Sequence, residues 1–190
     1  MSKTVNPTKV ITGKKTVMSY LNVNEPKVPL GGGTPKYSVS LIIPKDDTAT
    51  IEKIKAAIQA AYDEGQSKLM NANKTVPDLD SIKTPLRDGD KDRKGDEAYK
   101  NSFFVNANST TKPGVVDADC NPILDSSELY SGIVGRASIT FYAFNSSGNK
   151  GIACGLNNIQ KLSDGTPLGG HSRAEDDFAD ADDDDDDFLG

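Results

Sequence analysis

Basic and aromatic side chains occur close together at several points along the chain, and this pairing is its clearest candidate for chemistry. Single-stranded nucleic acid is held by positive charge that follows its phosphates and by aromatic faces on which its bases stack. The candidate DNA-binding residues are Lys14, Lys15, Tyr20, Lys36, Arg87, Lys91, Arg93, Lys94, Tyr99, Lys100, Phe103, Arg136 and Tyr142. The pattern therefore predicts a nucleic-acid interface that uses phosphate contacts and base stacking.

Side chains that support catalysis are sparse. The single histidine, His171, lies in a polar stretch, so a rigid Ser-His-Asp or Cys-His arrangement around it is not expected. Cys120 and Cys154 with one histidine do not supply the four ligands of a zinc site. The stretch DGDKDRKGDEAY resembles a calcium loop, but Arg93 and Tyr99 stand where that loop needs Gly and Glu. We predict that the protein is not an enzyme and needs no metal or other cofactor.

Charge is unevenly distributed along the chain. The 190 residues include 22 Lys and Arg and 28 Asp and Glu, a net charge of -6. Ten of the acidic residues lie from Glu175 onward, so residues 1–174 hold eighteen acids against all 22 basic residues and carry about +4. The acidic end is expected to be disordered, because it cannot bury enough apolar surface to fold.

Near its end, the acidic segment contains six consecutive aspartates followed by an aromatic residue. These are Asp182, Asp183, Asp184, Asp185, Asp186, Asp187 and Phe188. A tethered polyanion competes with DNA for a basic groove at high effective concentration. We expect the tail to weaken DNA binding and, once displaced, to offer Phe188 to replication or recombination proteins.

The start of the chain, MSKTVNPTKV, lacks the apolar stretch of a signal peptide. Two cysteines in 190 residues favour a reducing, intracellular setting over a disulfide framework. No apolar run approaches the roughly 20 residues that cross a bilayer, so no membrane association is expected.

Alternating and periodic patterns place most of the candidate residues on expected elements. Residues 10–23 and 36–44 are predicted strands, and in the second Tyr37 falls in phase with Val39 and Leu41 and should be buried. A single amphipathic helix is predicted from a cap at Asp47 or Thr48 as far as residue 69. Residues 71–96 have no hydrophobic period and are expected to form a long surface loop.

The second half of the chain is strand-rich. Residues 99–109, 129–144 and 151–162 are predicted strands, with a short extended piece over 112–128 and a bulge or sharp bend near Gly132 and Gly135. Along residues 138–144, Phe141 should face the core and Tyr142 the solvent. The result is a mainly β fold, a five-stranded antiparallel barrel with one amphipathic helix and long loops over residues 1–168, followed by the tail at 169–190. An immunoglobulin-type sandwich is the competing architecture.

The stretch ELYSGIVGRASITFYAFNSSGNKGIACGLNNIQKLSDGTPLGG, followed by DDFADADDDDDDF, resembles the single-stranded DNA-binding proteins of tailed bacteriophages, a family formerly described as a domain of unknown function. The resemblance implies an OB-fold and binding of single-stranded DNA without strong sequence preference. It further implies a role in phage DNA replication or recombination in the cytoplasm of an infected bacterium. Because the predicted helix follows the second strand and not the third, groove residues are not carried over by position.

Two other functions compete with DNA binding. In the first, the protein is a non-enzymatic structural or interaction protein whose acidic tail binds basic partners. That hypothesis predicts that Tyr99, Phe103 and Tyr142 are buried and that the lysines are scattered. In the second, the protein is a metal-dependent nuclease, which would cleave labelled DNA when magnesium is present.

Overall fold

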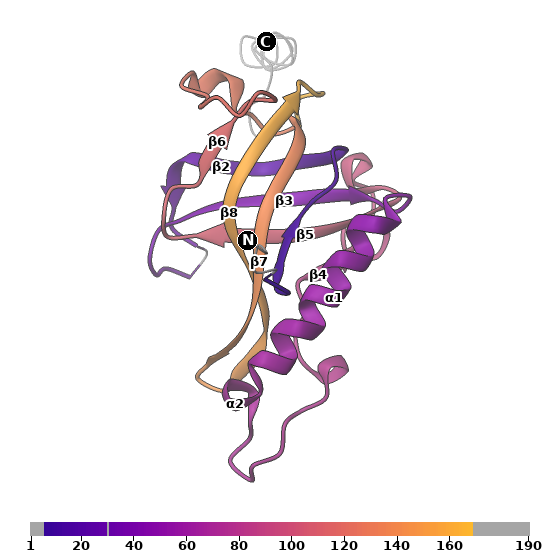
Figure 1. The fold of residues 1–190 in the computed structure, drawn as a ribbon, viewed down its shortest axis with the longest axis vertical. Coiled ribbons are helices and arrows are strands. Elements are labelled where there is room, and N and C mark those ends of the chain that lie inside the picture. The colour runs from indigo at the N-terminus through magenta and orange to yellow at the C-terminus, as the bar shows by residue number, and fades with distance from the viewer. Residues whose placement is uncertain (1–5, 30, 169–190) are drawn as a thin grey trace, which may run out of the picture.

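The computed structural model describes residues 6–29 and 31–168 (Figure 1). Its strands are β1 (Lys9–Ile11), β2 (Thr16–Lys27), β3 (Lys36–Pro44), β4 (Leu86–Asp88), β5 (Ser102–Ser109), β6 (Gly114–Val116), β7 (Val134–Ser146) and β8 (Asn149–Ser163). Its helices are α1 (Thr48–Glu64), α2 (Gln66–Leu69) and α3 (Gly89–Asp92). The molecule is mainly β, as predicted, but has more strands and helices than the five and one expected.

Five strands form a closed ring. β7 pairs with both β2 and β8, and the ring continues from β2 through β3 and β5 back to β8. The pairing of β5 with β8 is parallel, through the single register pair Asn108 and Gly155, and the other four pairings are antiparallel. The prediction of a wholly antiparallel barrel is wrong at this contact, because a closed ring of five strands cannot alternate direction throughout.

The expected strand over residues 10–23 is divided into β1 and β2 by a turn at Thr12–Lys15. The turn is fixed from two sides: Gly13 accepts hydrogen bonds from the amide and hydroxyl of Thr16, and its own amide donates to the Thr50 hydroxyl at 3.0 Å. β1 then pairs with the outer edge of β7. Local polar contacts therefore override the continuous β pattern of the sequence.

α1 begins where its capping residue predicts. The Asp47 carboxylate accepts from the Thr50 amide at 3.3 Å and from the Thr50 hydroxyl, which satisfies one of the free amide donors of the first turn. Ile54 and Ile58 lie on the face that packs into the core. The helix ends at Gly65 and not at Leu69, because the Gly65 backbone leaves helical geometry (φ −99°, ψ 16°) before α2 begins. Ala143 packs so closely here that a Cβ at position 65 would collide with its side chain.

The core lies inside the ring and under α1. Alternate residues of β7, among them Ile139 and Phe141, are fully buried, as the pattern predicts. Cys154 is also buried, which raises the pKa of its thiol by desolvation. Tyr37, which was expected in the core, is only half-buried because it lies near the start of β3, at the end of the sheet.

The region 71–96 is more ordered than its sequence suggested. β4 pairs with β5 within it, and α3 follows directly. Within the stretch predicted as one strand from residue 129, β7 begins only at Val134, after a turn in which Gly132 has φ +119°. The register of β7 against β8 shifts beside Gly135, where a Cβ would collide with the Gln160 carbonyl oxygen. A bulge near these glycines is thus confirmed.

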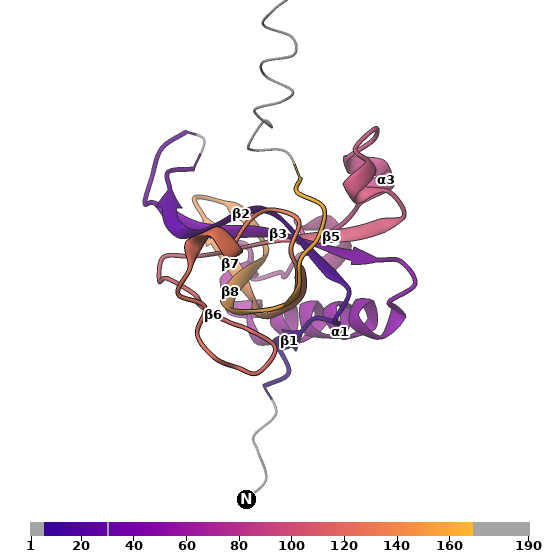
Figure 2. The same ribbon diagram turned by 90° about the horizontal axis from the view of Figure 1, so that it is seen from above.

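The β7–β8 hairpin runs beyond the ring and forms a narrow lobe with α2 and the end of α1 (Figure 1). Seen from above, the β2–β3 connection and the α3 segment project on either side of the sheet formed by β2, β3 and β5 (Figure 2). These two segments are the walls of the surface described next.

Candidate nucleic-acid interface

The outward face of β2, β3 and β5 presents small hydrogen-bonding side chains in register. One row consists of Ser19, Ser40 and Asn106, and the next consists of Asn22, Ser38 and Asn108. We call these six residues the polar floor. Ser19 and Ser40 are buried, and Ser40 already accepts from Tyr99, so the floor meets a ligand through Asn22, Ser38, Asn106 and Asn108. These four side chains both donate and accept, so they can bond many different polar edges.

β2 bulges beside the polar floor. Ser19 pairs with Ser40 and Asn22 with Ser38, so Tyr20 and Leu21 of β2 lie opposite the single residue Val39, and β2 holds one extra residue. Tyr20 has φ 47°, unusual for an aromatic residue, and its side chain is 52% exposed. The bulge therefore turns an aromatic ring out of the strand toward solvent.

Arg93 covers an aromatic cluster at one end of the polar floor. Its guanidinium carbon lies 5.4 Å from the ring centre of Tyr20, 5.3 Å from that of Tyr99 and 5.7 Å from that of Phe104. Arg87 approaches the same Phe104 ring at 5.3 Å. A planar guanidinium on aromatic faces is held in place while its remaining N–H groups stay available to phosphate.

The prediction that Tyr99 binds DNA through its aromatic ring is wrong. Its side chain is 1% exposed, so it cannot serve as a base-stacking surface. Its ring packs edge-on against Phe104, with centres 5.0 Å apart, and its hydroxyl donates to the Ser40 hydroxyl at 2.9 Å. The residue lies in the short helix at Glu97–Tyr99, which folds back onto the sheet and closes a second small core with Ile42.

Ion pairs fix the α3 wall to the sheet. Lys45, just after β3, lies 3.0 Å from the carboxylate of Asp88 and 2.7 Å from that of Asp90. The hydrogen bonds from Lys45 lower the pKa of both carboxyls, and the Asn101 amide adds to the effect at Asp90. The same two carboxylates raise the pKa of Lys45.

Other carboxylates of the α3 wall also have partners, whereas several of its basic residues form no ion pair. Asp92 pairs with Arg87 at 3.1 Å, and Asp96 caps the short helix through the Ala98 amide. Among the described residues, ion pairs do not involve the four remaining basic side chains of this wall, Lys91, Arg93, Lys94 and Lys100. The α3 wall therefore offers four basic side chains to an anionic ligand, beside Asp96 and Glu97, which form no ion pair within the described residues either.

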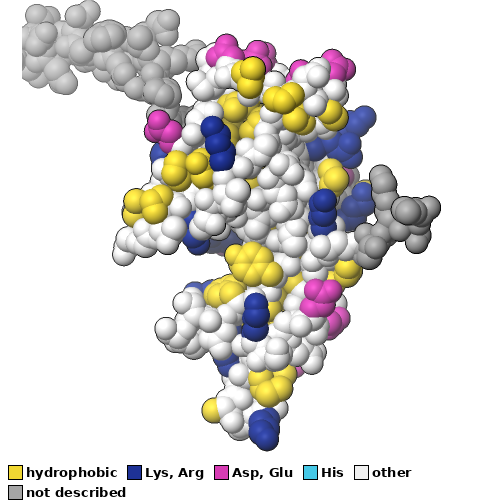
Figure 3. Space-filling view, turned by 60° about the vertical axis from the view of Figure 1, so that its left-hand side comes forward, with side chains coloured by type: hydrophobic (Ala, Val, Ile, Leu, Met, Phe, Trp, Pro, Cys, Tyr) yellow, Lys and Arg dark blue, Asp and Glu magenta, His cyan; other side chains and the backbone are white. Residues whose placement is uncertain are grey.

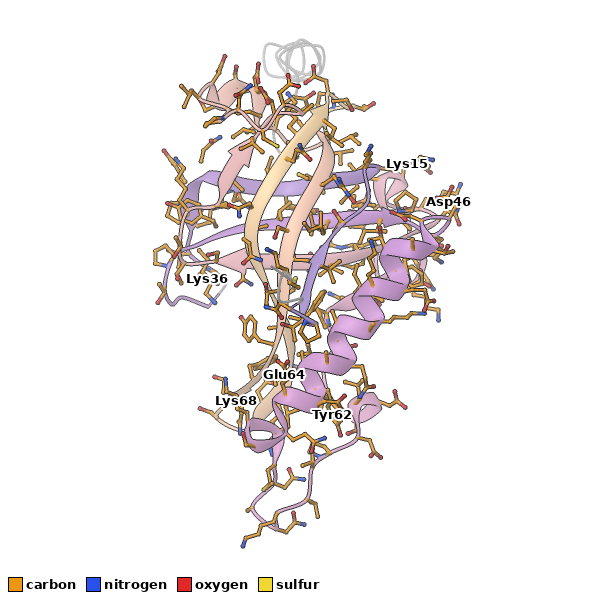
Figure 4. The ribbon with its side chains drawn as sticks, in the orientation of Figure 1. Lys15, Lys36, Asp46, Tyr62, Glu64 and Lys68 are labelled. Atoms are coloured by element: carbon orange, nitrogen blue, oxygen red, sulfur yellow. The ribbon has the colours of Figure 1, made fainter. Side chains whose placement is uncertain are left out.

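Other predicted residues lie around this surface or away from it. Lys36 begins β3 at the opposite wall, and Lys15 lies before β2 at the other end of the sheet, next to Lys14 (Figure 4). Phe103 is half-buried on the inner face of β5, with Lys45 5.3 Å from its ring centre, and is not presented to the floor. It is therefore corrected to a packing residue.

Arg136 and Tyr142 are not brought to the polar floor. Arg136 lies on β7 and its Nε donates to the Thr12 carbonyl at 3.2 Å, beside the β1 edge. Tyr142 lies on the hairpin lobe and is 44% exposed, as its phase predicted. The structure therefore separates these two residues from the rest of the predicted set.

A groove of about 510 Å³ opens beside Tyr20. Asn22, Asn24 and Lys27 of β2 line one side, and Tyr130 and Leu168 line the other. Leu168 is the last described residue, and its amide donates to the Ser131 carbonyl at 2.9 Å. In Figure 2 this end of the chain lies between the two walls. The predicted tail residues, Asp182 to Asp187 and Phe188, lie outside the described residues.

Sequence reasoning missed the polar floor. Its residues are neither charged nor aromatic, so no motif distinguishes them. The available signal was the spacing of small polar residues at every second position in KYSVS and VNANS, the outward phase of two predicted strands.

The arrangement can hold a flexible anionic polymer by charge, stacking and hydrogen bonds. Within the described ranges, no group of three or more acidic, His or Cys side chains is placed to bind a metal ion. None of the helices described is long and apolar enough to span a membrane.

A family model described as Enterobacter phage Enc34, ssDNA-binding protein, matches residues 8–189. The chain belongs to this family.

Relatives and solved structures agree with the family assignment. The putative protein p50 of Acyrthosiphon pisum secondary endosymbiont phage 1 is 29% identical over 159 residues, covering 80% of this chain and 83% of that protein. The single-stranded DNA-binding protein of bacteriophage Enc34, solved in complex with ssDNA, superposes with a TM-score of 0.72 at 22% identity, over 85% of this chain and 90% of that one. The bacteriophage T7 single-stranded DNA-binding protein gp2.5 matches with a TM-score of 0.50 at 18% identity, over 90% and 93%.

The recognition of a phage single-stranded DNA-binding family from the sequence is thus confirmed. The Enc34 and T7 proteins are named for DNA binding and not for an enzymatic reaction, which agrees with the prediction that this family member is not an enzyme.

Proposed function

We propose that the groove over β2, β3 and β5 binds single-stranded DNA without strong sequence preference. The observation on which this rests is Arg93, which lies over exposed Tyr20 at the edge of the polar floor. A positive group beside a free aromatic face is what a phosphate and its neighbouring base require. The competing hypothesis predicted that Tyr99, Phe103 and Tyr142 are buried. It fits Tyr99 and the half-buried Phe103 but not the exposed Tyr142.

The five-stranded ring provides the scaffold, and we interpret it as an OB-fold. In OB-folds, the nucleic acid crosses the face of the second and third strands between two projecting loops. Here the β2–β3 connection and the α3 segment occupy the positions of such loops (Figure 2). Arg87 and Arg93 stand on one wall and Lys36 on the other, so phosphates entering at either side meet positive charge.

Tolerance of sequence follows from the residue types on the floor. Ser and Asn side chains rotate to offer a donor or an acceptor, so Asn106 and Asn108 can bond any base edge. Tyr20 stacks on any base because every base has an aromatic face. Affinity arises from phosphate contacts, and binding therefore weakens steeply as salt concentration rises.

The acidic tail is proposed to regulate this groove. The last described residue, Leu168, lines the groove together with Tyr20, and residues 169–190 follow it in the sequence. Ten carboxylates tethered there compete with DNA for the same basic side chains. DNA that displaces the tail leaves Phe188 available to replication or recombination proteins, in the cytoplasm of an infected bacterium.

A titration of the full chain with fluorescently labelled oligonucleotides tests the proposed function. We expect tighter binding of a single strand than of a duplex of the same length and sequence at low salt. The four homopolymers should bind with similar affinity. Equal binding of duplex and single strand, or no binding of either, would contradict the proposal.

A further inference from the structure

A second exposed surface lies on the hairpin lobe, away from Tyr20. It is a cavity of about 500 Å³ between α2 and β7, with Lys68 and Met70 on one side and Tyr142 and Phe144 on the other. Tyr142 is 44% and Met70 41% exposed. Figure 3 shows hydrophobic side chains beside Lys or Arg where this lobe meets the body of the molecule. We call these four residues the hairpin patch.

Two glycines of β8 lie next to the aromatic rings of the hairpin patch. Phe144 pairs with Gly151, and a Cβ at Gly151 would lie 3.0 Å from the edge of the Phe144 ring. A Cβ at Gly155 would lie 3.6 Å from the Tyr142 ring. Both rings thus lie close to β8. Tyr142, which is 44% exposed, has surface open to a stacking base, whereas Phe144 is half-buried.

Two lysines border the hairpin patch, and Glu64 at the end of α1 lies near Lys68 (Figure 4). Lys68 is exposed, and the Lys150 ammonium donates to the Met70 carbonyl at 3.2 Å and to the Asn71 side chain. Over the described residues, no carboxylate pairs with either lysine, and the residues that line the cavity include no Asp or Glu. A phosphate next to a stacked base would meet these ammonium groups without repulsion from lining carboxylates.

The hairpin patch is connected to the polar floor through the sheet itself. Asn22 pairs with Ser38, and Ser38 pairs with Asn108. Asn108 is in turn the register partner of Gly155, the glycine beside the Tyr142 ring. One row of outward positions therefore runs from β2 across β3 and β5 to β8, and the aromatic ring of β7 stands at its end.

We infer that the hairpin patch is a second contact for single-stranded DNA, reached by a strand that leaves the polar floor across β5 and β8. A base stacks on Tyr142, and Lys68 neutralises a phosphate beside it. This inference rests on the proposed function, since it extends the path of the same DNA strand. It gives the protein a longer site than the groove alone.

The chain contains no tryptophan, so a Tyr142→Trp variant of the full chain carries a single indole reporter in the patch. Two oligothymidylates are compared: one of about 6 nucleotides, within the roughly 4–16 that one OB-fold covers, and one of about 30. Binding of each is measured independently by fluorescence anisotropy of a label on the DNA. We expect the long oligonucleotide to quench the indole emission of this variant and the short one to bind without quenching it.

The outcomes separate the two proposals. If the long oligonucleotide binds by anisotropy and the indole emission does not change, the second contact is wrong and the groove proposal stands. If neither oligonucleotide binds, the proposed function fails and the second contact fails with it. If a peptide of residues 175–190 changes the indole emission while DNA does not, the hairpin patch is a protein-docking site and the inference is overturned.

Substitutions provide a second measurement. Tyr142→Ala should weaken binding of the long oligonucleotide at least about fivefold and leave the short one unchanged, while Tyr142→Phe keeps the stacking ring and the affinity. Lys68→Gln should weaken only the long complex at low salt. Lys53→Gln, at an exposed position on α1 outside the patch, is the matched control. Equal effects of the two lysine variants would contradict the assignment.

Discussion

At the scale of single residues, the aromatic side chains near the groove divide into two roles. Tyr20 is turned outward by the β2 bulge, whereas Tyr99 and Phe104 are buried beneath Arg93. The buried pair positions the guanidinium, and the exposed ring is left for a base. This division depends on backbone geometry, which the residue types alone do not reveal.

The structural role of Tyr99 leads to a prediction about stability. Tyr99→Phe removes the hydroxyl that donates to Ser40, at a cost of about 1 kcal/mol in the free energy of unfolding. Because the ring remains, affinity for single-stranded DNA should not change. Chemical denaturation and an oligonucleotide titration measure the two effects. A large loss of DNA affinity at unchanged stability would show that Tyr99 contacts DNA after all.

At the scale of elements, the sequence predicted those with a clear period and missed those without one. The strand β3 and the Asp47 cap of α1 were confirmed, although β3 is buried on both faces from Val39 to Ile43 and does not show the expected alternation. β4 and α3 span three and four residues, too short for any hydrophobic period to show, and they are held by tertiary contacts to β5 and Lys45. The α3 wall was therefore predicted as basic loop residues and not as a fixed element.

The ion pairs of Lys45 give the α3 wall a predictable pH dependence. The lowered pKa values of Asp88 and Asp90 mean that their contribution to stability is present at neutral pH and is lost as the pH falls through those pKa values. The raised pKa of Lys45 means that its contribution is lost again as the pH rises through that value.

Lys45→Met should therefore lower the free energy of unfolding at pH 7, and the difference from the original chain should shrink at about pH 3. Denaturant unfolding at the two pH values measures this. Lys53→Met, at an exposed position on α1, should show no such dependence. A Lys45→Met difference that is equal at both pH values would show that the ion pairs do not stabilise the wall.

At the scale of the whole molecule, the C-terminal end of the described chain lies at the groove beside Tyr20. The β2–β3 connection and α3 border the sheet, and the described chain ends between them at Leu168 (Figure 2). Composition predicted a basic body and an acidic tail. It could not predict that the described chain ends at Leu168 beside Tyr20, because that depends on how Ser131 and Leu168 pair across the fold.

Removal of the acidic tail should strengthen DNA binding. A chain that ends at Gly170 loses all ten terminal carboxylates, and we expect tighter binding of single-stranded DNA at low salt. The gain should decrease as salt rises, because competition between tail and DNA is electrostatic. Replacing the six aspartates 182–187 with asparagine keeps the length and should give most of the same gain. Unchanged affinity in both variants would show that the tail does not occupy the groove.

The central claim is that DNA lies over Arg93 in the groove between the two walls. The most direct test measures the slope of log affinity against log salt for single-stranded DNA in Arg93→Gln and Arg136→Gln chains. Arg136 is a matched arginine on β7, away from the polar floor. We predict that only Arg93→Gln lowers the slope, by about 0.7 for one lost phosphate contact. Equal slopes in both variants, or a loss confined to Arg136→Gln, would contradict this position of the DNA.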